Sequence, residues 1–288
     1  MTTRHGESVF FRSGALRLHA IRHRADEGGR ASPPAAGGRR PIVVVPGITT
    51  PAGAFSFAGS AFARMAGVGD VIVLDMRGRG LSERAPSGQH RAGDYAEDVL
   101  ALIDHLQLWA EQPLLVGHSL GARVVASARA RVPGCSAGVV AIDPPMSGPG
   151  RRPYPMGVDR FLDGIHGARE GRGVADARAH YPTWSDEQVA QRGEWLGSCD
   201  ELAVVESYSW FHLEAFEPVW QEVEPPALLL YGDESPVVTS DDAAHLHEVN
   251  PRADLVSVAH AGHMIPWDNL EQTVGEIGSF LSKLEETQ

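Results

Sequence analysis

Short runs of Val, Ile and Leu alternate with amphipathic helical patterns along most of this chain. The runs Ile42–Val45 (IVVV) and Val71–Leu74 (VIVL) are continuously apolar, which is typical of parallel strands that are buried on both faces of a sheet. Between such runs, Tyr95–Leu106 repeats its apolar residues at the spacing of a helix packed on a sheet. This alternation predicts an α/β fold built on a mostly parallel, doubly wound sheet.

The same reasoning assigns the other elements. An opening hairpin is expected over 9–12 and 17–23, and Arg24–Arg40, rich in Gly, Pro and Ala, is expected to be a flexible loop. Further strands are expected at 114–116, 139–142, 227–230 and 255–258, and further helices at 53–65, 122–131, 240–247 and 270–284.

The alternation breaks after Asp143. Residues 144–225 contain Pro, Gly, Arg and most of the tryptophans, without a clear strand. We therefore predict an α/β core formed by residues 1–143 and 226–288, with a helical cap over 144–225 inserted after the sixth strand. Ligands of open α/β sheets bind outside the carboxyl ends of the strands, so we looked for reactive side chains in the loops at that edge.

Composition limits the partners of the chain. Of its 288 residues 43% are apolar and 22% are charged, and a net charge of −12 makes nucleic acids and anionic membranes poor partners. Cys135 and Cys199 cannot form a disulfide framework, and no Cys/His cluster suggests a metal. The N-terminus resembles no signal peptide, and no apolar run reaches the length of a membrane span. We expect a cytoplasmic protein that needs no cofactor and no metal; the sequence does not indicate its oligomeric state.

A candidate nucleophile follows the expected strand at 114–116. Gly117–Gly121 (GHSLG) matches G-x-S-x-G, the nucleophile elbow. The pattern is short enough to occur by chance, but it lies at a strand-to-helix turn, where the mechanism requires it. Glycines allow backbone to pass closely at such a strained turn, and a helix N-terminus offers N–H groups to a developing oxyanion. We interpret Ser119 as a nucleophile rather than a helix cap, and His118 as structural.

A serine nucleophile needs a base that removes its proton. The candidate base is His263, in the sequence AGHM after the last expected strand. His260 is the weaker alternative, because it lies closer to the end of that strand. Without one of these histidines Ser119 has no base.

The acid that orients the base has two candidates. Many hydrolases with this elbow place it after the strand before the last, but that position holds Ser235 here, and the nearby Asp233 is expected to bond the loop backbone instead. Asp143 lies at the carboxyl end of the strand that follows the elbow helix, directly before two prolines that fix the local backbone. We favour Asp143, with Asp233 left as the alternative or as an assisting group.

The oxyanion hole is expected to use two backbone donors. One is the N–H of Leu120, the residue after the nucleophile, and the other is the N–H of Ile48, in the loop after 42–45. Thr49 is a candidate to add a hydroxyl to the binding site, with Thr50 as the alternative; either could equally cap the helical run that begins at Pro51.

Taken together, these elements resemble the α/β-hydrolase superfamily and, within it, the N-formylmaleamate deformylases of nicotinate degradation. The unspecific part of the likeness lies in Pro46–Ala52 (PGITTPA), Asp75–Ser82 (DMRGRGLS) and Gly117–Arg123 (GHSLGAR). The more particular part lies in Asp143–Pro155 (DPPMSGPGRRPYP), Trp184–Cys199 (WSDEQVAQRGEWLGSC) and Ala261–Leu270 (AGHMIPWDNL).

The resemblance implies an α/β-hydrolase fold, an acid at Asp143, and hydrolysis of an N-formyl amide to formate and an unsaturated amide-acid. It implies an anionic small-molecule substrate, with Arg151 and Arg152 as candidates to bind its carboxylate. Arg77 and Arg79 are rivals, although Arg77 is expected to anchor its loop.

Six aromatic residues are candidates to wall the substrate pocket, although most of them are expected to form the core of the cap. They are Tyr154, Trp184, Trp195, Trp210, Phe211 and Trp267. The alternatives are an esterase, a carbon–carbon bond hydrolase, an acylamino-dicarboxylate amidase, and a small-molecule receptor that does no chemistry on the same fold.

Overall fold

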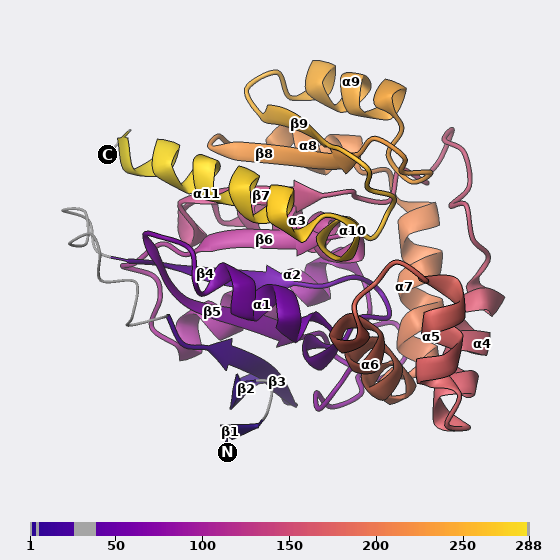
Figure 1. Ribbon diagram of the computed structural model, residues 1–288. Helices are drawn as coiled ribbons and strands as arrows, with labels where there is room; N and C mark the ends of the chain where they lie inside the picture. Colours follow the sequence, from indigo (N-terminus) through magenta and orange to yellow (C-terminus); the bar gives the residue numbers. More distant parts are fainter. Residues whose placement is uncertain (1, 4–5, 26–38, 287–288) are drawn as a thin grey trace.

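A computed structural model describes residues 2–3, 6–25 and 39–286 as strands and helices around one sheet (Figure 1). The described strands are β1 (Thr2–Thr3), β2 (Gly6–Ser13), β3 (Leu16–His23), β4 (Arg40–Val45), β5 (Val68–Asp75), β6 (Leu114–His118), β7 (Gly138–Ile142), β8 (Ala227–Gly232) and β9 (Asp254–Val258). Their order in the sheet is β1-β2-β3-β5-β4-β6-β7-β8-β9. The pairs from β1 to β5 are antiparallel, and those from β5 through β4 to β9 are parallel.

Every strand expected from the sequence is present, so the mostly parallel α/β sheet is confirmed. The short strand β1 was not expected, and it makes β7 the seventh described strand rather than the sixth. Of the loop expected over Arg24–Arg40, residues 26–38 lie outside the described residues.

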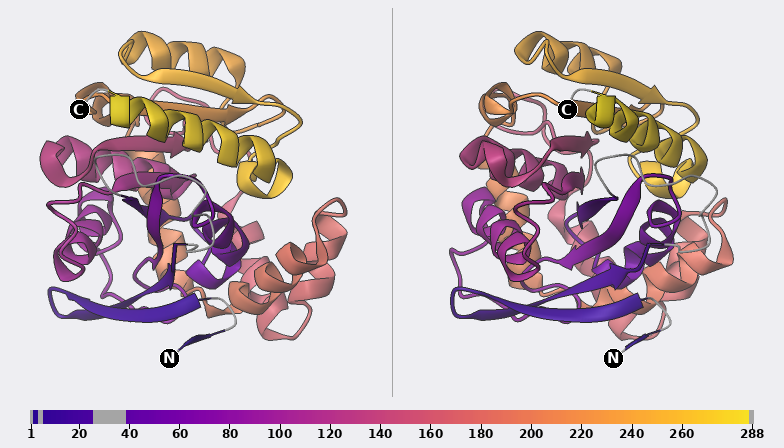
Figure 2. Two further views of the ribbon diagram at one scale, coloured as in Figure 1. Left: turned by 60° about the vertical axis from the view of Figure 1, so that its left-hand side comes forward. Right: turned by 90° about the vertical axis from the view of Figure 1, so that its left-hand side faces the viewer.

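Helices cover both faces of the sheet, as Figure 2 shows in two further views. They are α1 (Ser56–Phe62), α2 (Ala92–His105), α3 (Leu120–Arg131), α9 (Ser240–Val249), α10 (Ile265–Asp268) and α11 (Leu270–Glu286), with short 3-10 turns η1 (Ala52–Phe55) and η2 (Pro133–Cys135). Successive strand residues point to opposite faces. In β4, Ile42 and Val44 pack with α1 and α11, whereas Val43 and Val45 pack with α2 and α3. This double burial explains the continuously apolar strands.

Further helices lie in the chain between β7 and β8, where the sequence lacks strand patterns. They are α4 (Val158–Arg169), α5 (Gly173–His180), α6 (Asp186–Trp195), η3 (Leu196–Ser198), α7 (Glu201–Leu213) and α8 (Glu217–Glu222). The helices α4 to α7 pack on one another at the carboxyl ends of the strands (Figure 1). The short α8 instead packs on α3 and α9, where Trp220 is fully buried.

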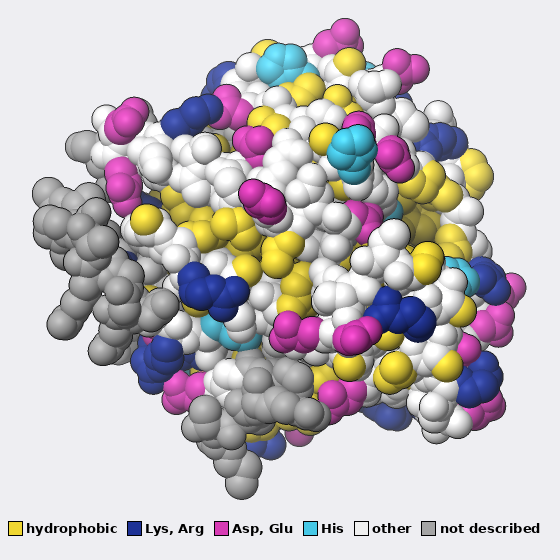
Figure 3. All heavy atoms as spheres, viewed as in Figure 1, with side chains coloured by type: hydrophobic (Ala, Val, Ile, Leu, Met, Phe, Trp, Pro, Cys, Tyr) yellow, Lys and Arg dark blue, Asp and Glu magenta, His cyan; other side chains and the backbone are white. Residues whose placement is uncertain are grey.

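The surface is mixed in charge, and acidic and basic side chains lie interspersed on the face seen in Figure 3. Within the described residues, no helix combines the length and the apolar character needed to cross a membrane.

A buried ion pair fixes the loop after β5. Arg77 binds both carboxylate oxygens of Asp98 in α2, at 2.8 and 2.7 Å, and also donates to the backbone oxygens of Gln89 and Asp94. The expectation that Arg77 anchors its loop is confirmed. Because this loop also carries Arg79, the ion pair supports a residue that contacts the site described below.

Replacing Asp98 by alanine is expected to lower the free energy of unfolding by about 3–5 kcal/mol, because it removes the carboxylate that binds the buried guanidinium of Arg77 through two hydrogen bonds. Urea denaturation measures the loss. The double variant Arg77→Met/Asp98→Leu removes both charges and is expected to lose less than Asp98→Ala. Equal losses in the single and double variants would contradict this account of the loop.

Candidate active site

Ser119 occupies the sharp turn between β6 and α3. Its backbone has φ 56° and ψ −120°, a strained conformation for a residue with a side chain. The turn is tied to the neighbouring strand, because the Ser119 N–H donates to the backbone oxygen of Ile142 at 2.8 Å. Ser119 therefore stands at the carboxyl end of the sheet, at the N-terminus of α3.

Two glycines make this turn possible. A Cβ on Gly121 would lie 1.8 Å from the backbone oxygen of Val45, and one on Gly117 would lie 2.2 Å from the backbone oxygen of Gly121. Both distances are far inside van der Waals contact with rigid backbone. The elbow and the strand that precedes the oxyanion loop thus pack directly against each other.

The structure brings the three residues of the expected triad together. His263 Nδ1 lies 2.6 Å from Asp143 Oδ2, and His263 Nε2 lies 3.0 Å from Ser119 Oγ. Since a carboxylate only accepts, Nδ1 carries the hydrogen and donates to Asp143. Nε2 is then an acceptor that faces the serine hydroxyl, the arrangement a general base requires.

Asp143 is completely buried at the tip of β7. Burial raises the pKa of its carboxyl, whereas the hydrogen bonds from His263 and Ser235 act in the opposite direction. Ser235 lies in the loop after β8, the alternative location of the acid, and its hydroxyl donates to Asp143 Oδ2 at 2.6 Å. The carboxylate of Asp143, after β7, thus accepts a hydrogen bond from a hydroxyl in the loop after the neighbouring strand β8.

The alternative residues lie elsewhere. Asp233 Oδ1 accepts from the backbone N–H of Ala261 at 3.3 Å, as expected for a residue that bonds the loop. The side chain of His260 is 90% exposed, with its ring nitrogen 4.0 Å from Glu234. Neither contacts Ser119.

The loop that carries His263 is held on two sides. Asp268 accepts from the Gly262 N–H at 3.0 Å and from the indole of Trp184, in the cap, at 3.0 Å. On the other side, His118 donates from Nε2 to the backbone oxygen of His263 at 2.8 Å. Burial lowers the pKa of His118 to about 3, so its ring stays neutral. This supports the structural interpretation of His118.

The candidate oxyanion loop follows β4. Gly47 O accepts from the Thr50 N–H at 3.0 Å, and because N–H and C=O of one peptide point in opposite directions, the Ile48 N–H points out of this turn. In the described part of the chain, no hydrogen bond engages the backbone N–H of Ile48 or Leu120. Both donors thus remain available for a ligand.

Two arginines hold this loop by its carbonyl groups. Arg79 donates to Ile48 O at 3.1 Å, and Arg192, in α6, donates to Thr49 O at 2.5 Å and to Thr49 Oγ1 at 3.1 Å. The Thr49 hydroxyl, expected to contact substrate, therefore bonds the cap. No sequence pattern indicates this role of Arg192, because its partner lies 143 residues away along the chain.

The assignment of Arg151 and Arg152 to the substrate carboxylate is corrected by the structure. Arg151 pairs with Glu217 at 3.1 Å and with Asp242 at 3.0 Å. Arg152 also pairs with Asp242 and donates to the backbone oxygens of residues 236 and 237. These guanidinium groups join the start of the cap to α8 and α9. Their charge is neutralised within the protein, which disfavours a role in binding an anion.

Trp184 and Phe211, expected to wall the pocket, belong to the packed cap instead. Trp184 stacks on Tyr181 with ring centroids 3.8 Å apart and on Trp267 at 5.5 Å. Phe211 is 1% exposed and packs on the ring of Tyr154 at 5.3 Å. Both side chains are packed among other aromatic rings, as expected for most aromatic residues of the cap.

Tyr154 reaches the triad, although the sequence marked it only as one of several aromatic residues. Its hydroxyl lies 3.1 Å from His263 Nε2, beside Ser119. The residue follows the proline-rich stretch after Asp143, and no sequence pattern sets the direction of its side chain there.

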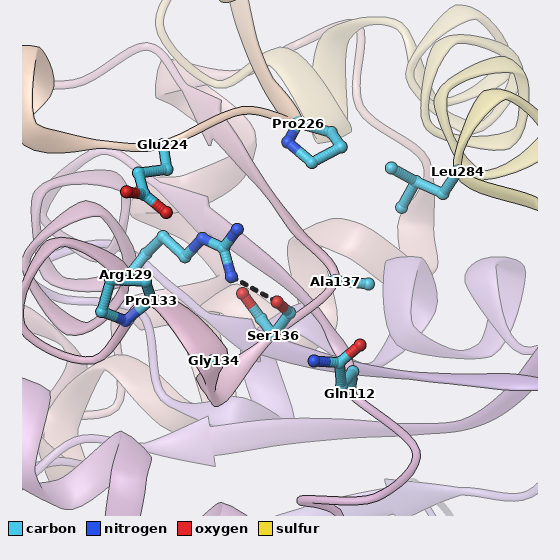
Figure 4. A pocket seen from close by; sticks show the side chains of 9 residues that line it. All are labelled: Gln112, Arg129, Pro133, Gly134, Ser136, Ala137, Glu224, Pro226 and Leu284. Atoms are coloured by element: carbon cyan, nitrogen blue, oxygen red, sulfur yellow. Dashed lines mark hydrogen bonds between the residues drawn. The ribbon is translucent and has the colours of Figure 1, made fainter. Parts of the chain in front are cut away.

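An open pocket of about 400 Å³ lies away from the triad. Its lining includes Gln112, Ala137 and Pro226, which come just before β6, β7 and β8. It therefore lies at the amino ends of the parallel strands, the edge opposite Ser119. Figure 4 shows Arg129 in its wall, hydrogen bonded to Ser136. In the described residues, no group of three or more His, Cys, Asp or Glu side chains is placed to hold a metal ion.

The chain is similar in sequence to several known hydrolases. A family model for the alpha/beta hydrolase fold matches residues 40–270. N-formylmaleamate deformylase of Pseudomonas putida is 37% identical over 276 residues, which cover 95% of this chain and 98% of the relative. The 2-(acetamidomethylene)succinate hydrolase of Mesorhizobium japonicum is 28% identical over 73% of this chain and 77% of the relative.

A solved structure extends the likeness to three dimensions. The N-formylmaleamic acid deformylase of Pseudomonas putida S16, crystallised as a Ser-to-Ala variant, superposes with a TM-score of 0.82. It is 31% identical and covers 94% of this chain and 100% of its own.

The buried ring of His118 predicts a pH-dependent stability. Its pKa is about 3 in the folded state against an ordinary 6.5, so between these values the unfolded state binds more protons and stability falls as the pH is lowered. At pH 5 the loss from this group is about 2 kcal/mol, and above about pH 7 none is expected. Urea titrations at both pH values measure it.

The control is His118→Gln, whose amide can donate to the same carbonyl but does not titrate. The loss of stability between neutral pH and pH 5 should be smaller in this variant by about 2 kcal/mol. The explanation fails if the two proteins lose the same amount.

Proposed function

The chain belongs to the α/β-hydrolase family, and from this premise we propose that it is a serine hydrolase that deformylates N-formylmaleamate or a close unsaturated amide-acid. The observation that carries the chemistry is the continuous line of hydrogen bonds from Asp143 through His263 to Ser119. The substrate class is supported by the relative that is 37% identical over nearly the whole chain.

The geometry supports a two-step reaction. Ser119 Oγ attacks the formyl carbon while its proton passes to His263 Nε2, and the N–H groups of Ile48 and Leu120 receive the oxyanion. The carbon–nitrogen bond then breaks, the nitrogen takes the proton from Nε2, and a formyl-enzyme is left. Water, activated by the same histidine, releases formate.

An N-formyl amide suits this machinery. Its leaving nitrogen is conjugated to a second carbonyl, which makes it a far better leaving group than a simple amine. A Ser–His–Asp site can expel such a group with modest help from a general acid.

Arg192 replaces Arg151 and Arg152 as our candidate for the substrate carboxylate. It lies beside the oxyanion loop and uses two of its nitrogens on Thr49. These bonds engage a neutral carbonyl and a neutral hydroxyl, so they do not neutralise the positive charge of Arg192. A cytoplasmic location remains part of this proposal.

Formate release tests the activity. The wild type is expected to convert N-formylmaleamate to formate and maleamate in equal amounts, and Ser119→Ala is expected to lose at least about 1,000-fold in kcat. Circular dichroism confirms that the variant is folded. If the wild type hydrolyses 4-nitrophenyl acetate but releases no formate, the substrate assignment is wrong and a panel of esters and acylamino-dicarboxylates is the next measurement.

The identity of the acid is tested by two amide variants. Asp143→Asn is expected to lower kcat by roughly 1,000- to 10,000-fold, because an amide no longer stabilises the required tautomer of His263. Asp233→Asn is the matched control and is expected to change kcat less than about 5-fold, since Asp233 contacts only loop backbone. A larger effect at 233 than at 143 would reverse the assignment.

A further inference from the structure

Two hydroxyl groups face one ring nitrogen in the site. Ser119 Oγ lies 3.0 Å from His263 Nε2, and the phenol oxygen of Tyr154 lies 3.1 Å from the same atom. Ser119 is the nucleophile of the triad, whereas the reaction described above assigns no role to Tyr154. Yet the phenol is buried and held, because its ring packs on Phe211 and Phe161 at centroid distances of 5.3 and 6.1 Å.

Around His263 Nε2 there are more hydrogen-bond donors than acceptors. Since Nδ1 of His263 carries the hydrogen donated to Asp143, Nε2 has one lone pair for two O–H donors. When Nε2 takes the proton of Ser119, it becomes a donor itself and the O–H of Tyr154 loses its acceptor. Ser119 Oγ also lies within hydrogen-bond reach of the phenol, but once it is bonded to the formyl carbon it is a weak, ester-like acceptor. The stronger acceptor is then a polar group of the bound substrate.

The sheet topology decides which part of the substrate this is. The oxyanion loop follows β4 and Tyr154 follows β7, and these strands flank β6 on opposite sides. Tyr154 thus follows a strand on the opposite side of β6 from the strand that leads to the Ile48 donor. A formyl carbon carries only hydrogen, oxygen and the leaving nitrogen, so with its oxygen in the oxyanion hole, the polar group that remains is the leaving amide.

We propose that the hydroxyl of Tyr154 donates a hydrogen bond to the leaving group while the carbon–nitrogen bond breaks, which makes Tyr154 a catalytic residue. The inference rests on the proposed function. As the bond breaks, its electron pair stays on nitrogen and spreads to the adjacent carbonyl oxygen. Nitrogen receives its proton from His263 Nε2, and Tyr154 keeps its own proton throughout. Burial also raises the pKa of Tyr154, which keeps the phenol protonated and able to donate.

The test compares leaving groups in Tyr154→Phe and the wild type. The substrates are N-formylmaleamate and a series of aryl acetates from 4-nitrophenyl to phenyl, and kcat/KM is measured because it reports the acylation step. A donor matters most for the poorest leaving group. We expect a loss of about 10- to 100-fold on the amide and on phenyl acetate, but less than about 3-fold on 4-nitrophenyl acetate.

The control is Tyr208→Phe, which removes a phenol from the same aromatic cluster, at a ring distance of 6.4 Å from Tyr154. It is expected to change no substrate by more than about 2-fold. Equal losses across the series in Tyr154→Phe, or no loss, overturn the proposal, because a merely structural role does not depend on the leaving group. If the wild type releases no formate, the proposed function fails, and the aryl acetates still decide the role of Tyr154.

Discussion

The hydrogen bond of 2.6 Å between Asp143 and His263 is the interaction on which the rest of the site depends. A fully buried carboxylate is costly unless it is paired, and here an imidazole and the hydroxyl of Ser235 pair with it. The bond also fixes the hydrogen of the imidazole on Nδ1. The free lone pair of Nε2, and with it the roles of Ser119 and Tyr154, follow from that one choice of tautomer.

The helices between β7 and β8 complete the site as well as covering it. Arg192 holds the oxyanion loop by a carbonyl and a hydroxyl of Thr49, and Trp184 binds the aspartate that supports the His263 loop. Arg79 holds the neighbouring carbonyl from the core side. The donors that receive charge and the base that moves protons are therefore positioned jointly by both parts of the chain.

Much of this could be predicted from local sequence, because apolar strands and a glycine-flanked serine impose their structure over a few residues. Asp143 was predictable since it ends a strand next to the elbow. The assignment of Arg151 and Arg152 failed because their acidic partners lie as many as 91 residues further along the chain. Tyr154 was not predictable as a neighbour of Ser119, because the aromatic packing against α4 and α7 directs its ring.

The ion pairs of Arg151 and Arg152 with α8 and α9 have a consequence for turnover. Both partners of these pairs are partly exposed, whereas in the pair of Asp143 with His263 the carboxylate is fully buried. Dissolved ions weaken exposed pairs more than buried ones. Added salt therefore weakens the links of residues 151 and 152 to α8 and α9 more than it weakens the bond between Asp143 and His263. Substrate entry and product departure, where they require that stretch to move, respond to ionic strength separately from the chemical step.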